Sequence, residues 1–331
     1  MNLPKQEKQY LPIIVVLRGL AALAVCMFHF TKEFVNEDGL VRAVFRNGWM
    51  GVEVFFVISG FVIPFSLLGT SFRFYHYFKF MKKRFIRIEP AYLISVVLVV
   101  ILSYAASQTP GFAGEPFKMS IGLLIQHILY LVEFFNNTWL NPVYWTLEVE
   151  FHFYLIIGLL IALWNLKKRW LTIASIIGLF SVSFINQDVI TFFKYTDIFV
   201  LGILTAFYKK EQLGLKPYIA SLLIVSFVVY DSHGIIISLL TLATATLISF
   251  ASSYGNVKSL IFLGNISYSL YLLHVPIGVK IVNLSKRLDL NETSKYGVIL
   301  VALSFSIFAA WLFYKYIEKP SHQWAKKVKF N

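Results

Sequence analysis

Long apolar stretches recur along the whole chain, and each is about as long as a helix that crosses a bilayer. A membrane-spanning helix needs roughly 20 apolar residues. Ten such spans are predicted, at residues 11–30, 49–68, 90–106, 143–164, 170–186, 190–208, 217–231, 234–252, 260–284 and 296–317. Apolar residues make up 58% of the 331 residues and charged residues only 14%, which is too little polar surface for soluble domains of this length. The sequence therefore predicts an all-α polytopic membrane protein that forms a single membrane-embedded domain over residues 1–331.

The distribution of lysine and arginine predicts how these helices are oriented. With a cytoplasmic N-terminus, 20 of the 30 basic residues fall in the predicted inner segments and 8 in the outer ones. Because cytoplasmic loops carry the excess of Lys and Arg, we expect both the N- and the C-terminus to be cytoplasmic. The net charge of +13 then reflects loops that face anionic lipid, so the bilayer is an expected partner and nucleic acid is not. The first span is expected to belong to the mature protein rather than to a cleaved leader.

The first predicted span contains two ionisable residues, Arg18 and His29. Such groups are costly inside a membrane and are therefore functional candidates. Their spacing is three helical turns plus about 20°, with a rise of about 16 Å, so both project from one helix face at different depths. Each also has a structural explanation, since Arg18 could pair with a carboxylate and His29 could lie at the membrane interface.

The second predicted span carries one carboxylate, Glu53, close to its outer end. This residue is either functional or paired with a cation, and we place it in the candidate substrate pocket. Ser59 and Gly60 follow in the same span, and small residues usually allow membrane helices to approach closely. The packing interpretation is therefore favoured for Ser59 and Gly60.

A basic and aromatic segment, residues 72–90, follows the second span on the predicted cytoplasmic side. Most of its lysines are expected to contact anionic headgroups. Arg84 and Arg87 differ in placement, because they share a helix face just before a predicted helix start at Pro90. Two guanidinium groups at that position could clamp a phosphate group.

Two later spans carry polar residues with helical spacing. Glu148 and Glu150 are 200° apart on a helix, so they face nearly opposite sides, and Glu150 shares a face with Tyr154. In the ninth span, a single polar stripe predicted to face a hydrated cavity is formed by Ser267, Tyr271 and His274. Tyr271 and His274 are therefore candidates for the substrate pocket.

Taken together, these motifs resemble the acyltransferase-3 family, bacterial multi-spanning sugar O-acyltransferases. The matching segments are Arg18-x10-His29, residues 51–60 (GVEVFFVISG), Arg84-x-x-Arg87 before Pro90, residues 145–154 (WTLEVEFHFY) and residues 267–274 (SYSLYLLH). The chain departs from the family pattern at Phe151, where many members carry a second glutamate beside the one matching Glu150. A role for that second carboxylate is therefore not expected here.

The resemblance implies transfer of an acyl group, usually acetyl from acetyl-CoA, to a carbohydrate hydroxyl. It also implies a catalytic histidine matching His29 and a CoA-binding role for the basic motif. It further implies a multi-pass protein of the bacterial cytoplasmic (inner) membrane, with a carbohydrate or lipid-linked glycan as acceptor.

A mechanism that fits these residues places the CoA phosphates at Arg84 and Arg87, with the pantetheine arm entering past Arg18. His29 would then act as general base or carry the acyl group briefly, since an imidazole suits proton uptake near neutral pH. Glu150 would orient or charge-stabilise that imidazole, and no metal is expected. The alternatives are a proton-coupled transporter, a non-catalytic scaffold, and the same chemistry with another donor such as succinyl-CoA.

Overall fold

The computed structural model describes residues 11–109, 117, 119–185, 190–251 and 257–330, and these residues form helices joined by turns and loops. The α-helices are α1 (Pro12–Thr31), α2 (Leu40–Phe45), α3 (Gly51–Leu67), α4 (Tyr77–Ser107), α5 (Ile121–Leu129), α6 (Trp145–Trp164), α7 (Arg169–Ser181), α8 (Thr191–Lys194), α9 (Thr196–Lys209), α10 (Leu215–His233), α11 (Ile235–Phe250), α12 (Lys258–Leu273), α13 (Lys280–Ser285), α14 (Glu292–Phe313) and α15 (Lys319–Lys327). Three 3-10 turns lie at Gly48–Met50, Phe74–His76 and Val182–Phe184, and two π-helical segments at His274–Val279 and Tyr314–Glu318.

The prediction of an all-α polytopic membrane protein is confirmed. Within the described residues, seven helical segments are long and apolar enough to cross a membrane. They are Pro12–Thr31, Leu40–Leu67, Phe74–Ser107, Trp145–Trp164, Leu215–His233, Lys258–Ser285 and Glu292–Lys327. Two more apolar helical segments are shorter, at Arg169–Phe184 and Ile235–Phe250. The count of ten spans and the sides on which the termini lie stay predictions.

Two predicted spans differ in form from the helices observed. The span predicted at 190–208 is divided between α8 and the 14-residue helix α9, whose residues Thr196 to Phe207 are all buried by other helices. The helix start predicted at Pro90 is wrong, because α4 begins at Tyr77 and passes through Pro90. Membrane helices tolerate an internal proline when neighbouring groups satisfy the freed backbone, and the basic segment is therefore the first part of a long helix.

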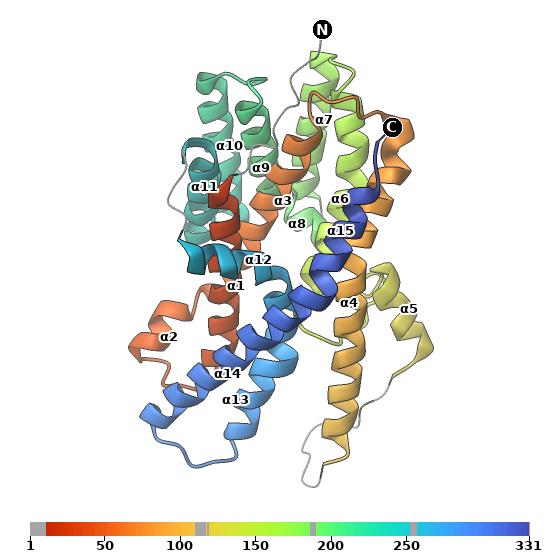
Figure 1. The fold of residues 1–331 in the computed structure, drawn as a ribbon. Coiled ribbons are helices and arrows are strands. Elements are labelled where there is room, and N and C mark those ends of the chain that lie inside the picture. The colour runs from red at the N-terminus through yellow and green to blue at the C-terminus, as the bar shows by residue number, and fades with distance from the viewer. Residues whose placement is uncertain (1–10, 110–116, 118, 186–189, 252–256, 331) are drawn as a thin grey trace.

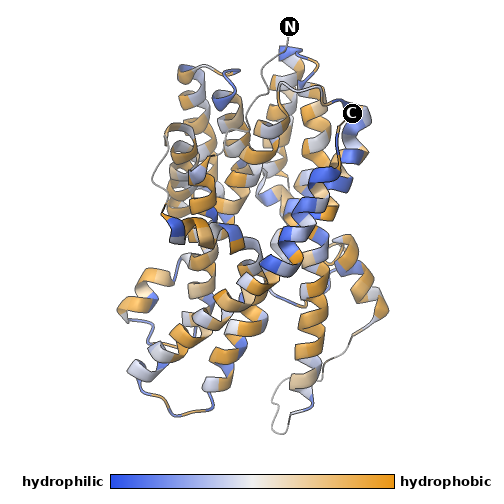
Figure 2. Cartoon of the chain, in the orientation of Figure 1, coloured by the Kyte–Doolittle hydropathy of each residue, from blue (hydrophilic) through white to orange (hydrophobic). Residues whose placement is uncertain are grey.

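Figures 1 and 2 show how the helices are arranged. Helices α9, α10 and α11 pack together beside α3, whereas α4 packs against α6 and α15 on the other side of the molecule (Figure 1). Helix α14 runs obliquely across the view and continues into α15. Apolar colour follows the lower part of α4 in the view, while α15 is largely hydrophilic (Figure 2). The polar residues of the site come from helices that meet between these two groups.

Small residues set the distance between α3 and α9. A Cβ atom added at Gly60 would overlap the carbonyl oxygen of Phe199, and one added at Gly202 would overlap the carbonyl oxygen of Val57. The two backbones are therefore in direct contact, as is common between membrane helices with small residues at the crossing. The packing interpretation of Gly60 is confirmed.

Replacing Gly202 with alanine should destabilise the protein by about 1–3 kcal/mol, because the methyl group has to push α9 away from α3. The expected result is a lower thermal midpoint in detergent. Gly178→Ala is the matched control, since no described residue beyond its own stretch of helix has an atom within 4 Å of the position its Cβ would take. An equal thermal midpoint for the Gly202 and Gly178 variants would contradict the proposed close packing.

Candidate functional site

A cavity of about 200 Å³ lies within the helical bundle and is the centre of the candidate site. Its walls come from α1, α3, α4, α6, α12 and the last helical segment of the chain. The predicted residues that line it are Arg18, Arg84, Arg87, Glu150 and Tyr271. The polar residues that join them are Ser59, Thr146, Tyr154, Tyr268, Glu318 and His322. Helices distant in sequence thus bring together the polar groups of four predicted motifs.

Positive charge is in excess in the cavity. It holds the guanidinium groups of Arg18, Arg84 and Arg87 against the carboxylates of Glu150 and Glu318. Among the described residues, none of these three arginines forms an ion pair with a carboxylate. The guanidinium of Arg84 instead lies 5.4 and 5.5 Å from the ring centroids of two aromatic residues, Phe80 and Tyr154. The arginines are therefore available to an anionic ligand.

The two carboxylates of the cavity have hydroxyl partners of their own. Ser59 Oγ donates to Glu150 Oε1 at 2.5 Å, and Ser269 donates to Glu318 Oε2 through its backbone N–H (3.2 Å) and its Oγ (2.6 Å). The packing interpretation favoured for Ser59 is therefore wrong, because its hydroxyl lines the cavity and holds Glu150. Glu318 Oε1 lies 3.6 Å from Nε2 of His322.

The two glutamates of α6 face different surroundings, as the helical spacing predicts. Glu150 and Tyr154 line the cavity. Glu148 is buried elsewhere with 1% of its surface exposed, and no described residue forms a hydrogen bond with its Oε2. The predicted separation of the two side chains is confirmed.

His29 is not among the described residues that line the cavity. The cavity lining reaches Tyr271 and Phe55, whose rings are 5.9 Å apart between centroids. The ring of His29 lies 5.2 Å from the ring of His274, and that ring lies 5.8 Å from the ring of Tyr271. The rings of His274 and Tyr271 thus connect the predicted histidine to the cavity. Glu150 forms a hydrogen bond with Ser59, and the orienting contact predicted between Glu150 and His29 is not observed.

The polar stripe predicted in the ninth span is only partly correct. Ser267 is fully buried, and its hydroxyl donates to the Gly264 carbonyl of its own helix at 2.8 Å. Tyr268 occupies the place predicted for Ser267, since Tyr268 lines the cavity together with Tyr271. The tyrosine ring is wide enough to reach the cavity from a helical position next to the predicted stripe.

A proline and an asparagine shape the backbone at His274. Pro276 lacks the N–H group that would donate to the Leu272 carbonyl in a regular helix, and the chain forms the π-helical segment His274–Val279 at this point. The amide Nδ2 of Asn141 donates to the Leu272 carbonyl at 3.3 Å instead. A connection from outside the helix therefore holds the segment that carries His274.

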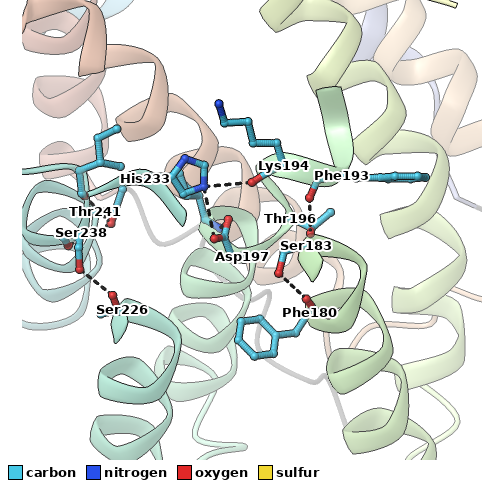
Figure 3. Close-up of polar contacts among 12 residues, drawn as sticks. Phe180, Ser183, Phe193, Lys194, Thr196, Asp197, Ser226, His233, Ser238 and Thr241 are labelled. Atoms are coloured by element: carbon cyan, nitrogen blue, oxygen red, sulfur yellow. Dashed lines mark hydrogen bonds and ion pairs between the residues drawn. The ribbon is translucent and has the colours of Figure 1, made fainter. Parts of the chain in front are cut away.

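Glu53 does not line the cavity, so its predicted place in the substrate pocket is not observed. It is 1% exposed, and its Oε2 has no hydrogen-bond partner in the part of the chain that the structure describes. It interacts electrostatically with His233 and Lys194, which belong to a second polar cluster. In that cluster, His233 Nε2 lies 3.3 Å from Asp197 Oδ2 and 3.0 Å from the Lys194 carbonyl oxygen (Figure 3). The cluster connects the end of α10 to the start of α9.

A smaller side pocket of about 20 Å³ shares part of its wall with the main cavity. The shared residues include Arg84 and Glu150, and the additional ones include Phe151 and Tyr130. The rings of Phe151 and Tyr130 are stacked with a centroid separation of 4.6 Å. The residue that departs from the family pattern therefore contributes an aromatic wall next to the cavity.

Glu318 and His322 are the cavity residues that sequence reasoning missed. The tenth predicted span ends at residue 317, whereas the observed helix continues through the π-helical segment Tyr314–Glu318 into α15. Their i, i+4 spacing places both on one helix face, and this spacing was the available signal. Within the described residues, no group of three or more His, Cys, Asp or Glu side chains is placed to hold a metal ion.

Comparison with known proteins assigns the chain to a family. The Acyl_transf_3 family model, described as an acyltransferase domain, matches residues 12–315. The chain belongs to the acyltransferase-3 family. It is 26% identical, over 94% of its length, to the O-acetyltransferase OatA of Staphylococcus aureus (strain NCTC 8325 / PS 47). It is 27% identical, over 81% of its length, to the putative acetyltransferase ORF330 of Acidianus two-tailed virus, with 84% of that protein covered.

Another similar protein is the putative O-acetyltransferase SACOL0978 of Staphylococcus aureus (strain COL), at 23% identity over 95% of the chain. The chain spans 57% of the length of OatA and 58% of the length of SACOL0978. No solved structure matches the chain at a significant level. The family match therefore shows that residues 12–315 of this membrane protein form an acyltransferase domain.

Proposed function

We propose that the protein transfers an acetyl group from acetyl-CoA on the cytoplasmic side to a hydroxyl group of a carbohydrate or lipid-linked glycan. The observation that carries this proposal is the cavity of an acyltransferase-family protein in which Arg18, Arg84 and Arg87 converge and form no ion pair with a described carboxylate. The relatives named as O-acetyltransferases favour acetyl as the acyl group and oxygen as the acceptor atom. The location proposed for this reaction is the bacterial cytoplasmic membrane.

The charge of the donor fits the arginine residues. CoA carries phosphate groups, and a guanidinium group binds phosphate through paired hydrogen bonds. Pockets for drug-sized ligands measure about 300–1,000 Å³, so a cavity of about 200 Å³ accommodates only part of an acyl-CoA. Arg84 and Arg87 bind the phosphates near the inner opening, and the thioester end passes Arg18 towards Tyr271.

The proposed transfer step uses His29 as a general base. One ring nitrogen of His29 takes the proton of the acceptor hydroxyl, and the hydroxyl oxygen attacks the thioester carbonyl carbon. A carbon–oxygen bond forms, the carbon–sulfur bond breaks, and the CoA thiolate leaves with a proton returned from the imidazolium. Tyr271 contacts Phe55 in the cavity wall and also contacts His274, whose ring lies next to that of His29. The side chains of Tyr271 and Phe55 therefore have to move when the acyl end of the donor reaches His29.

The proposal is tested with purified protein in liposomes, with acetyl-CoA labelled in its acetyl group and an oligosaccharide acceptor. The expected result is labelled oligosaccharide together with an equal amount of free CoA. The same assay with succinyl-CoA compares the two donors, and a faster succinyl reaction would reject acetyl as the preferred group.

A proton-coupled transporter is the second candidate, since ionisable groups in membrane helices also form proton pathways. Glu53, Asp197 and His233 are buried together in the second polar cluster, which is the observation that favours it. Accumulation of a labelled solute in liposomes under a proton gradient, with no consumption of acetyl-CoA, would support transport and contradict acyl transfer.

A further inference from the structure

The buried histidine His274 has one ring nitrogen whose protonation follows from its contacts. Its Nδ1 lies 2.7 Å from the Tyr271 carbonyl oxygen and 3.3 Å from the Leu270 carbonyl oxygen. A carbonyl oxygen can only accept a hydrogen bond, so Nδ1 carries the proton in the neutral ring. The other nitrogen, Nε2, is then a hydrogen-bond acceptor.

The acceptor nitrogen of His274 has no partner within the described part of the chain. The residue is completely buried, and Nε2 accepts no hydrogen bond from any described residue. A buried acceptor without a donor costs about 1–3 kcal/mol, so such groups need an explanation. The neighbouring ring that can supply an N–H group is His29, with 5.2 Å between the ring centroids.

His29 is free to adjust towards His274. Its side chain is only partly buried, at the last turn of α1, whereas the His274 ring is fixed by two carbonyl groups and by the π-helical segment His274–Val279. A rotation of the His29 ring can direct one N–H group at Nε2 of His274. The second ring nitrogen of His29 then faces away as the acceptor, which is the form a general base requires.

We propose that His274 is a positioning residue for His29: its Nε2 accepts a hydrogen bond from one ring nitrogen of His29 and so leaves the other unprotonated for the acceptor hydroxyl. This inference rests on the proposed function, in which His29 is the general base. The orienting role predicted for Glu150 passes to His274, because Glu150 is bonded to Ser59 in the cavity. Fixing the tautomer and orientation of a base is the role of the third residue in catalytic triads.

Two substitutions separate this role from a local role in the helix. In His274→Asn, the amide nitrogen takes the position of Nδ1 and keeps the hydrogen bond to the carbonyl of Tyr271, but the acceptor at Nε2 is lost. In His274→Gln, the amide oxygen reaches the position of Nε2, so an acceptor for His29 is kept. A positioning role therefore predicts that kcat is highest in wild type, lower in the Gln variant and lowest in the Asn variant.

The experiment measures kcat, KM for acetyl-CoA and the thermal midpoint of each variant in the liposome assay. We expect His274→Asn to lower kcat by about 10- to 100-fold with the acetyl-CoA KM unchanged. For His274→Gln we expect a smaller loss, at most half as large on a logarithmic scale, which is about 3- to 10-fold. His233→Gln is the control for a buried histidine outside the site, because His233 pairs with Asp197 (Figure 3), and its kcat should equal that of wild type.

Equal kcat values for the Asn and Gln variants, or a higher value for the Asn variant, would overturn the positioning role while transfer by wild type persists. If instead the proposed role of His29 as general base is wrong, the His29→Ala variant should keep full transfer activity. The thermal midpoint shows which variants fold, and for those the double variants with His29→Ala give a second comparison. If His274 acts through His29, adding His274→Asn to His29→Ala should cause no further loss of activity.

Discussion

Replacing His29 with alanine should lower the rate of acetyl transfer by about a thousandfold. General base catalysis contributes about 10²- to 10⁴-fold to a rate, and the alanine variant has no group at this position that can take the hydroxyl proton. His29 does not line the cavity proposed to bind the donor, so KM for acetyl-CoA should stay the same. The assay is the release of free CoA in the presence of a saturating oligosaccharide acceptor.

His152→Ala is the matched control for this experiment. His152 is also a histidine of a membrane helix, but it lies outside the cavity lining, with its ring 6.2 Å from that of Phe192. We expect its transfer rate to be close to that of wild type. A His29 variant with more than a tenth of the wild-type rate, and with the wild-type thermal midpoint, would remove His29 from the chemical step.

The largest effect on donor binding is expected for the double substitution Arg84→Ala and Arg87→Ala. Each charged hydrogen bond to a phosphate group contributes about 1.5–3 kcal/mol, so two of them correspond to at least about a hundredfold in the acetyl-CoA dissociation constant. Binding is measured by isothermal titration with acetyl-CoA in detergent. The Arg84→Lys and Arg87→Lys variant should keep part of the affinity, because lysine supplies the charge but not the paired geometry.

Lys168→Ala with Arg169→Ala is the control for a general loss of positive charge. These residues lie where α7 begins and do not line the cavity. Equal affinities for the two double variants would indicate that acetyl-CoA is attracted by the charge of the whole cytoplasmic surface, and would contradict a specific phosphate site at Arg84 and Arg87.

Helical periodicity is the part of the site that the sequence specifies well. The 200° between Glu148 and Glu150 is a property of any regular helix, and of these two glutamates α6 places only Glu150 in the cavity lining, on the same face as Tyr154. The same reasoning places Arg84 and Arg87 on one face of α4. These assignments depend on the geometry of one helix and not on its neighbours.

The contacts between helices could not be predicted in the same way. Ser59 has the size of a packing residue, and only the position of α6 relative to α3 makes it the partner of Glu150. The burial of α9 on all sides likewise depends on how the other helices surround it. The helix that continues from α14 into α15 passes Pro320, a residue type that usually ends a helix, so the contribution of Glu318 and His322 was hidden.

The depth of His29 relative to the cavity is the other feature that the sequence left open. The spacing of eleven residues predicts one face and a separation of about 16 Å from Arg18. It does not predict that Tyr271 and His274 lie between the end of the cavity and His29. Those two residues come from α12 and the segment after it, which contact α1 only in the folded protein.

The most direct test of the account is a structure of the protein bound to a non-reactive acetyl-CoA analogue. We predict phosphate groups at Arg84 and Arg87, the pantetheine arm in the cavity beside Arg18, and displaced side chains of Phe55 and Tyr271 with the acyl end close to His29. An analogue bound outside the cavity, or bound within it while Tyr271 still separates its acyl end from His29, would contradict the account.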